Sequence, residues 1–263
     1  MAKRLVRAKQ KIKNAHIPYR VPAAHVLPDR LNAVLAVLYL LFNEGYSASS
    51  GANLLRHGLC AEAIRLARLL RQLMPEEPEV GGLTALMLFQ DARRAARADE
   101  AGEIVPLEHQ DRTLWHRGQI NEGLTILEDA ERQGRPGPYQ LQAAIAACHV
   151  TATQAIDTDW ATIAGLYAQL ARLVPSAVVK LNRAVAVAMT DGPDAGLALV
   201  EALDDSGELT DYHLLPATRA DLLRRLGRHS EAAAAYRTAL DLAPTDAERR
   251  YLARRLAESG SDG

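Results

Sequence analysis

The stretch ADLLRRLGRHSEAAAAYRTALDLAP, residues 220–244, decides the fold class of this chain. Its first half places Ala220 and Leu223 on one helical face, and Gly227 then marks a turn. A second helix follows with small and aromatic side chains at helical spacing, at Ala232, Tyr236, Ala239 and Leu242, and ends before Pro244. Small residues let helices cross closely, an aromatic ring fills the gap, and proline stops the helix. The stretch therefore predicts two packed helices.

The same pattern recurs upstream in weaker form, at offsets of 36 and then 33 residues. The matching positions are Ala184, Val187, Gly196, Val200 and Leu203; Ile163, Tyr167, Leu170, Leu173 and Pro175; Ala63, Ala67, Leu70, Leu73 and Pro75; and Gly123, Leu127 and Ala130. This period is typical of tetratricopeptide (TPR) repeats, whose stacked helix pairs leave an extended concave face for a peptide or protein. We expect an all-α protein whose helical hairpins stack as a TPR-like right-handed solenoid.

Apolar residues recur at three- and four-residue spacing from Arg30 onward, with little strand-like alternation. The expected helices are 29–43, 59–74, 79–96, 118–133, 139–153, 158–174, 177–190, 194–204, 211–226, 229–242 and 245–258. We divide the chain into a basic segment and linker (1–28), a helical domain (29–135) and the TPR-like repeats (136–263).

The charge distribution sets the N-terminus apart from the rest of the chain. Seven Lys or Arg side chains lie between Lys3 and Arg20, and no Asp or Glu precedes Asp29, although the whole chain of 263 residues has a net charge of -1. Taken alone, residues 3–13 predict a basic amphipathic helix, facing either nucleic acid or solvent.

No apolar segment follows this basic start, so the sequence predicts no secretory signal. The longest apolar run, 33–42, is shorter than the roughly 20 residues that a membrane span requires. Cys60 and Cys148 lie far apart and predict buried thiols in a reducing compartment. We therefore expect a soluble, cytoplasmic protein.

An irregular stretch, residues 98–116, interrupts the helices, and its AGEIVPL segment is compatible with a small hairpin. Arg and Trp often dominate interface energies, and loops on rigid scaffolds often carry function. The partner-binding candidates are therefore Arg93, Arg97, Asp111, Arg112 and Trp115 around this stretch, together with Asn43, Glu44 and Tyr46 at the end of an apolar helix. The alternative is structural: Trp115 fixes the loop to the helices, and Arg97 pairs with Asp111.

Nucleotide-binding, serine-hydrolase and zinc-protease motifs are absent from the sequence. Acidic pairs such as Asp157 and Asp159 are more typical of helix caps than of acid–base catalysis. We expect no catalytic residue, no metal site and no cofactor.

Three long stretches carry a resemblance to a known family. YLLFNEGYSASSG (39–51), GRPGPYQLQAAIAACH (134–149) and DTDWATIAGLYAQLARLVPSAVVKLNRAVAVA (157–188) resemble the C-terminal extension of a group of extracytoplasmic-function (ECF) RNA polymerase sigma factors. In that group a TPR-like domain follows the promoter-binding regions. RLVRAKQKI (4–12) resembles the later turns of the region 4 recognition helix, which docks at the promoter −35 element.

The resemblance implies a regulatory, protein-interacting extension with no chemistry of its own. RNA polymerase core and promoter DNA would be bound by regions 2 and 4, which in the family precede the part that this chain resembles. A DNA-contact remnant would comprise Lys3, Arg4, Arg7, Lys9 and Lys11. The TPR-like groove would bind the protein's own sigma regions or a regulatory protein. The alternatives are a free-standing TPR-like adaptor and, third, a small-molecule sensor.

Overall fold

A computed structural model of the chain describes Asn14 and residues 26–46 and 57–261. The chain divides into two compact units, Met1–Val37 and Leu38–Gly263. In the first unit, Leu31 and Leu35 are buried on a helix. The expected DNA-contact remnant lies outside the described residues and comprises Lys3, Arg4, Arg7, Lys9 and Lys11.

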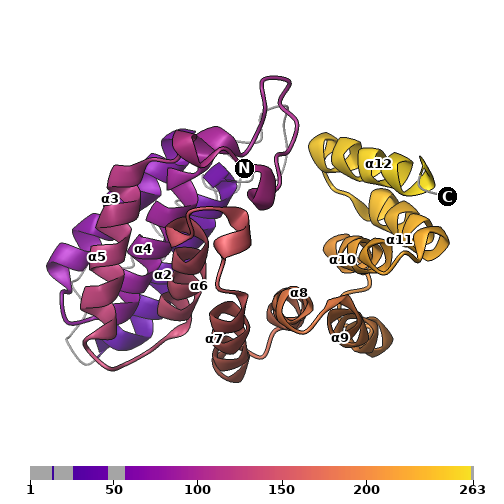
Figure 1. Ribbon diagram of the computed structural model, residues 1–263. Helices are drawn as coiled ribbons and strands as arrows, with labels where there is room; N and C mark the ends of the chain where they lie inside the picture. The colour runs from indigo at the N-terminus through magenta and orange to yellow at the C-terminus, as the bar shows by residue number, and fades with distance from the viewer. Residues whose placement is uncertain (1–13, 15–25, 47–56, 262–263) are drawn as a thin grey trace. The chain divides into compact units, whose positions relative to one another are not determined.

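The described part of the chain is all-α, as the sequence predicts (Figure 1). Its eleven α-helices are α2 (Leu27–Tyr46), α3 (His57–Leu73), α4 (Pro78–Ala92), α5 (Arg117–Glu131), α6 (Pro138–Thr151), α7 (Trp160–Leu173), α8 (Ala177–Thr190), α9 (Pro193–Ser206), α10 (Leu214–Arg225), α11 (His229–Leu242) and α12 (Asp246–Ser261). Short 3-10 helices follow α4 (η2, Arg94–Ala96), precede α5 (η3, Leu107–His109; η4, Arg112–Leu114) and precede α7 (η5, Ala155–Asp157). Among the described residues, no helix is long and apolar enough to cross a membrane.

Two predicted helices differ from the observed ones for identifiable reasons. The expected helix 79–96 ends at Ala92, because the carbonyl of Ala92 accepts the N–H of His116 at 2.8 Å and is not available to continue the helix. The expected helix 211–226 begins at Leu214 instead. Pro216 lies in its first turn, where a residue without an N–H is tolerated.

Consecutive helices pack against each other through the second unit. α4 packs against α3, α5 and α6, and from α6 to α12 each helix packs against the next one along the chain (Figure 1). The helices are thus arranged in sequential pairs. This is the local contact pattern that helical repeats produce.

The residues of the 220–244 stretch form the centre of the C-terminal core. Ala220, Leu223, Ala232 and Ala239 are fully buried, and Tyr236 is buried against them. Leu181, Ala184, Ala188, Val200 and Leu203 from α8 and α9 extend the same cluster. A second cluster around Leu141, Ile163 and Leu170 joins α6, α7 and α8. The small residues of the repeat pattern and Tyr236 are therefore core residues, whereas Tyr167 is only partly buried.

The start of α6 is stabilised by a side chain from another helix. Gly137 is the N-cap residue and offers no side chain. Glu79, in the first turn of α4, accepts the N–H groups of Tyr139 at 2.8 Å and of Gln140 at 3.0 Å. A Cβ at position 137 would lie 2.6 Å from Glu79 Oε1, so a larger residue there would displace the carboxylate from its capping position. The carboxylate also faces the positive end of the helix dipole.

We expect Glu79→Ala to lower the free energy of unfolding by about 1–2 kcal/mol, because two helix-terminal N–H groups lose a charged acceptor. Glu79→Gln keeps one acceptor oxygen and should lose less. Urea unfolding followed by far-UV circular dichroism measures both variants. If Glu79→Ala unfolds at the same urea concentration as the unaltered chain, this capping contact contributes nothing.

Candidate functional site

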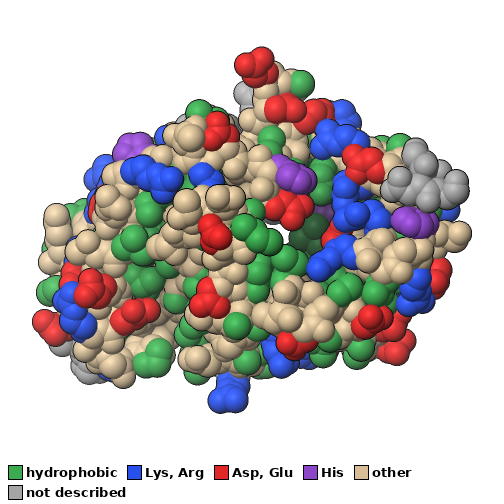
Figure 2. Space-filling view, viewed as in Figure 1, with side chains coloured by type: hydrophobic (Ala, Val, Ile, Leu, Met, Phe, Trp, Pro, Cys, Tyr) green, Lys and Arg blue, Asp and Glu red, His purple; other side chains and the backbone are tan. Residues whose placement is uncertain are grey.

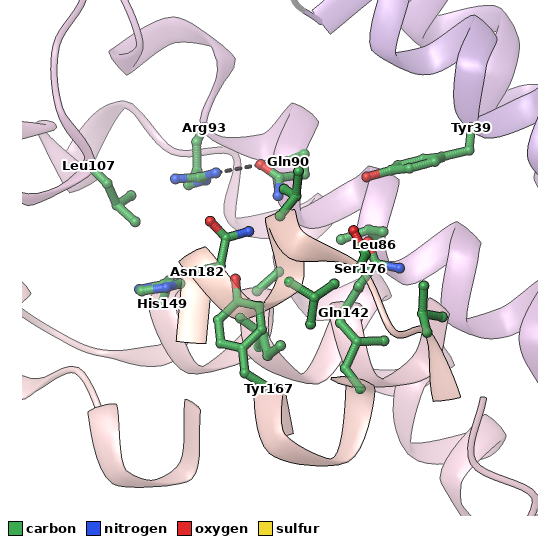
Figure 3. A pocket seen from close by; sticks show the side chains of 16 residues that line it. Tyr39, Leu86, Gln90, Arg93, Leu107, Gln142, His149, Tyr167, Ser176 and Asn182 are labelled. Carbon is green, nitrogen blue, oxygen red and sulfur yellow. Dashed lines mark hydrogen bonds between the residues drawn. The ribbon is translucent and has the colours of Figure 1, made fainter. Parts of the chain in front are cut away.

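A pocket in the second unit gathers side chains from helices that are distant in the sequence (Figure 3). Its volume is about 500 Å³. The walls come from α2, α4, α6, α7 and α8 and from three segments outside the α-helices. The lining residues are Tyr39, Leu86, Gln90, Arg93, Leu107, Gln142, Ile145, Ala146, His149, Tyr167, Leu170, Val174, Ser176, Val178, Val179 and Asn182.

Several polar groups of this pocket, including its arginine, lie close together. Figure 3 shows Arg93, Asn182 and His149 near one another, with the hydroxyl of Tyr167 directed toward them. Tyr39 lies on another side of the pocket. Aliphatic side chains supply most of the remaining wall, including Leu170 from the buried cluster of α6, α7 and α8. The pocket therefore has a polar cluster around Arg93, an aliphatic wall, and further polar side chains at Tyr39, Gln142 and Ser176.

Arg93 is held in place by a small hydrogen-bonded group. Its guanidinium donates to Gln90 Oε1 and, at 3.3 Å, to the hydroxyl of Tyr46. The Tyr46 hydroxyl donates to the same Gln90 oxygen at 2.7 Å. In the described part of the chain, Arg93 has no carboxylate partner. The pocket thus contains a positioned cation that forms no ion pair with any residue the structure describes.

Burial sets the protonation of the other polar groups. Burial, with the nearby cations Arg93 and Arg112, lowers the pKa of His149 to about 4, so its imidazole is neutral at pH 7. Burial raises the pKa of Tyr167 to about 12, so its phenol keeps its proton. No Asp or Glu is among the 16 lining residues. The lining therefore carries one positive charge at neutral pH.

A second hollow, of about 230 Å³, lies among the C-terminal helices. α8 contributes Val185, α10 contributes Thr218 and Asp221, and α12 contributes Tyr251 and Arg255. Figure 2 shows a hollow near these helices, with side chains of both charges around its opening. Alternate helices thus supply much of its lining.

The end of α2 is tied to the segment that follows α4. The Arg97 guanidinium donates to the backbone carbonyl of Tyr46 at 2.6 Å and lies 3.5 Å from the centre of the Tyr46 ring. Tyr46 also stacks on Phe42, with ring centres 5.5 Å apart. Asn43 and Glu44 are half-buried in the same turn. Of the predicted partner-binding residues, Tyr46, Arg93 and Arg97 therefore form one cluster.

The loop candidates form a different set of contacts. Arg112 donates to the backbone carbonyls of His149 at 2.8 Å and Ala152 at 2.7 Å, which fixes the loop to the end of α6. Its guanidinium also lies 4.4 Å from the ring centre of Trp115, which is buried. Asp111 accepts the N–H of Thr113 at 2.8 Å. Among the described residues no ion pair joins Arg97 to Asp111, and each has another partner within the chain.

The segment before these contacts forms the small hairpin that the sequence suggests. Ala98 and Ile104 make an antiparallel bridge, and Gly102 has a φ of +77°, a value that glycine readily adopts. Glu103, near the tip, forms an ion pair with Arg250 of α12. The hairpin thus contacts the last helix of the chain.

We expect Arg97→Met to lower the free energy of unfolding by about 1–2 kcal/mol, because it removes the bond to the Tyr46 carbonyl and the cation–ring contact. Methionine keeps most of the apolar bulk. Arg65→Met is the charge-matched control, since Arg65 is exposed and pairs with Glu62 on its own helix. Chemical denaturation compares the two, and equal midpoints would mean that the Arg97 contacts do not stabilise the fold.

Sequence reasoning did not identify Gln90, His149, Tyr167 and Asn182 as site residues. Tyr167 was assigned to the repeat pattern as a core aromatic, and His149 ends one of the stretches that carry the family resemblance. A usable signal was present, because polar side chains interrupt otherwise apolar helix faces at these positions. No group of three or more metal-ligating side chains occurs among the described residues.

Comparison with known proteins gives two matches. Residues 30–131 match a family described as "Family of unknown function (DUF6596)". An uncharacterized protein of Rhizobium meliloti (strain 1021) is 48% identical over 256 residues, which cover 97% of this chain and 60% of that relative. Nearly all of this chain is therefore similar to the Rhizobium meliloti protein, but it spans less than two thirds of that protein's length.

Proposed function

We propose that this chain is the regulatory, protein-interacting part of an ECF RNA polymerase sigma factor. In this proposal residues 136–263 form a TPR-like right-handed solenoid that binds a protein segment in its inner groove. The segment belongs to the sigma factor's own promoter-binding regions or to a regulatory protein. The chain itself catalyses no reaction and acts in the cytoplasm.

The observation that carries the proposal is the hollow lined mainly by α8, α10 and α12, together with Tyr236 of α11 and Glu108 of η3. In a stack of helix pairs, alternate helices form the inner face. Here the alternate helices place Thr218, Asp221 and Arg255 around one opening. The opening offers apolar surface beside an ion pair between Arg255 and Asp221 (3.0 Å), a combination suited to a peptide that has both apolar and charged side chains.

The family resemblance adds a second line of support. Its three stretches, 39–51, 134–149 and 157–188, contribute 12 of the 16 residues that line the larger pocket. They are therefore neighbours in the fold although they are separated in the sequence. The Rhizobium meliloti relative also has about two fifths of its length outside the match, since the match covers 60% of it, which leaves room for further domains.

In this proposal, sigma regions 2 and 4 bind polymerase core and promoter DNA. The genomic sequence upstream of the codon for Met1 tests this directly. We expect an in-frame region 2 and a helix-turn-helix of region 4. An upstream stop codon with neither region would instead support a free-standing adaptor.

The groove is tested by one blocking variant and its control. Thr218→Arg places a long charged side chain in the hollow, whereas Thr238→Arg makes the same change at an exposed position of α11. Both are made in the protein that includes the promoter-binding regions, and transcription from its promoter is measured with polymerase core. We expect Thr218→Arg to change promoter output several-fold and Thr238→Arg to leave it unaltered. Equal output from both folded variants would contradict a regulatory role for the groove.

A further inference from the structure

The larger pocket differs in character from the groove of the proposed function. It is lined by α4, α6, α7 and α8, and its volume of about 500 Å³ lies within the 300–1,000 Å³ that is usual for small-molecule sites. Such sites combine apolar walls with a few converging polar groups. This pocket has both, so its size and lining suit a small organic molecule.

The charges in the lining restrict the class of ligand. Arg93 supplies a full positive charge, and no carboxylate lines the pocket to compensate it. His149 contributes a neutral imidazole at pH 7 because burial and nearby cations depress its pKa. One positive charge is matched by a monoanion, whereas a phosphate monoester would bring close to two negative charges. A carboxylate is the common organic monoanion that arginine binds through paired N–H groups.

The neutral polar groups and the apolar wall restrict the class of ligand further. Asn182 and the hydroxyl of Tyr167 lie near Arg93 (Figure 3) and can donate hydrogen bonds to a carboxylate oxygen. Ile145, Leu170 and Val179 present aliphatic surface in the same pocket. A ligand with a negatively charged head and an apolar body would bind the polar groups around Arg93 and pack against the aliphatic residues.

We propose that this pocket binds a small organic monocarboxylic acid, with its carboxylate on Arg93 and Asn182 and its apolar body against α6, α7 and α8. This binding is independent of the sigma-factor proposal, because it concerns the chain alone. An occupant would contact helices from both sides of residue 135, and would therefore stabilise the packing of α4 and α6 on α7 and α8.

Two acids serve as probes: sodium octanoate and sodium 4-phenylbutyrate. Each is titrated into the full chain by isothermal calorimetry, and the melting temperature is followed in parallel. Octan-1-ol and octylamine have the same tail as octanoate without its negative charge. We expect at least one acid to bind with saturation at a single site and to raise the melting temperature, and neither control compound to do so. Absence of saturable binding by both acids, or equal binding of octan-1-ol, overturns the proposal.

The variants locate the binding. Arg93→Met is expected to weaken the affinity at least tenfold, and Asn182→Leu, at an exposed position of α8, several-fold. Arg172→Met makes the same charge change at an exposed position of α7 that does not line the pocket, and should bind as the unaltered chain does. If Arg93→Met fails to fold, the affinity of Asn182→Leu for the acid tests the site instead. Unchanged affinity in the folded pocket variants would place the acid elsewhere and refute the site.

Discussion

Gly196→Val is expected to destabilise the chain by about 3 kcal/mol, which corresponds to a fall of roughly 6–12 °C in melting temperature for a protein of this size. The reason is the close crossing of α8 and α9. A Cβ at position 196 would lie 2.4 Å from Ala188 Cβ and 2.8 Å from the backbone oxygen of Ala184. Ala184 and Ala188 are themselves fully buried, so neither can move aside without opening the core.

A matched control separates this crowding from the general effect of replacing a helical glycine. Gly165 is an exposed residue of α7, and a Cβ there would meet no atom within 4 Å. Gly165→Ala should therefore stabilise the chain by up to about 1 kcal/mol, since alanine is the better helix former. Thermal unfolding of both variants, followed by circular dichroism, gives the comparison. Equal melting temperatures for Gly196→Val and the unaltered chain would show that the two helices do not pack as closely as described.

The second large effect concerns pH and His149. Its pKa is lowered to about 4 in the folded chain, while an unfolded histidine titrates near 6.5. The stability linked to this residue is fully present above pH 6.5 and is lost as the pH falls toward 4, because only the unfolded chain takes up the proton. Between pH 7.5 and pH 5 we expect a loss of about 2 kcal/mol from this residue.

Two variants test this assignment. His149→Phe keeps an aromatic ring against Trp160, whose ring centre lies 5.2 Å from that of His149, and removes the titration. Its unfolding free energy should depend less on pH over this interval. His109→Gln replaces an exposed histidine in the loop and should keep the full dependence. Denaturation at a series of pH values measures all three chains, and an unchanged pH dependence in His149→Phe would assign the effect to other groups.

Much of the fold could be predicted from the sequence because the signals are local. Helix ends follow from proline, glycine and spacing, and the expected helices 177–190 and 229–242 have the bounds of α8 and α11. The early end of α4 could not be predicted, because it depends on a hydrogen bond to Ala92 from His116, 24 residues away. The cap of α6 has the same non-local origin, because Glu79 of α4 accepts the N–H groups at its start.

The pocket was less accessible to sequence reasoning for a related reason. Arg93 and Tyr46 were identified as candidates from their type and position, but the residues that complete their surroundings lie on other helices. His149, Tyr167 and Asn182 converge only when α6, α7 and α8 pack together. Periodicity alone gives no information on which polar residues of separate helices meet. Arg112 shows the converse, since a loop arginine expected to face a partner instead donates to backbone carbonyls of α6 and its C-cap.

The two thiols of the chain provide built-in chemical reporters. Burial raises the pKa of Cys60 to about 11, and its Sγ lies 3.6 Å from the carbonyl oxygen of Phe42, to which it donates. The thiolate is the nucleophile that attacks an alkylating reagent, so we expect Cys60 to react when the contact between α2 and α3 opens. Cys148, half-buried on α6, is a second thiol in the same molecule, and burial raises its pKa as well, so its labelling rate is the internal comparison and not that of a free thiol. The ratio of the two labelling rates therefore measures how often the α2–α3 contact breaks in the native chain, without any engineered probe.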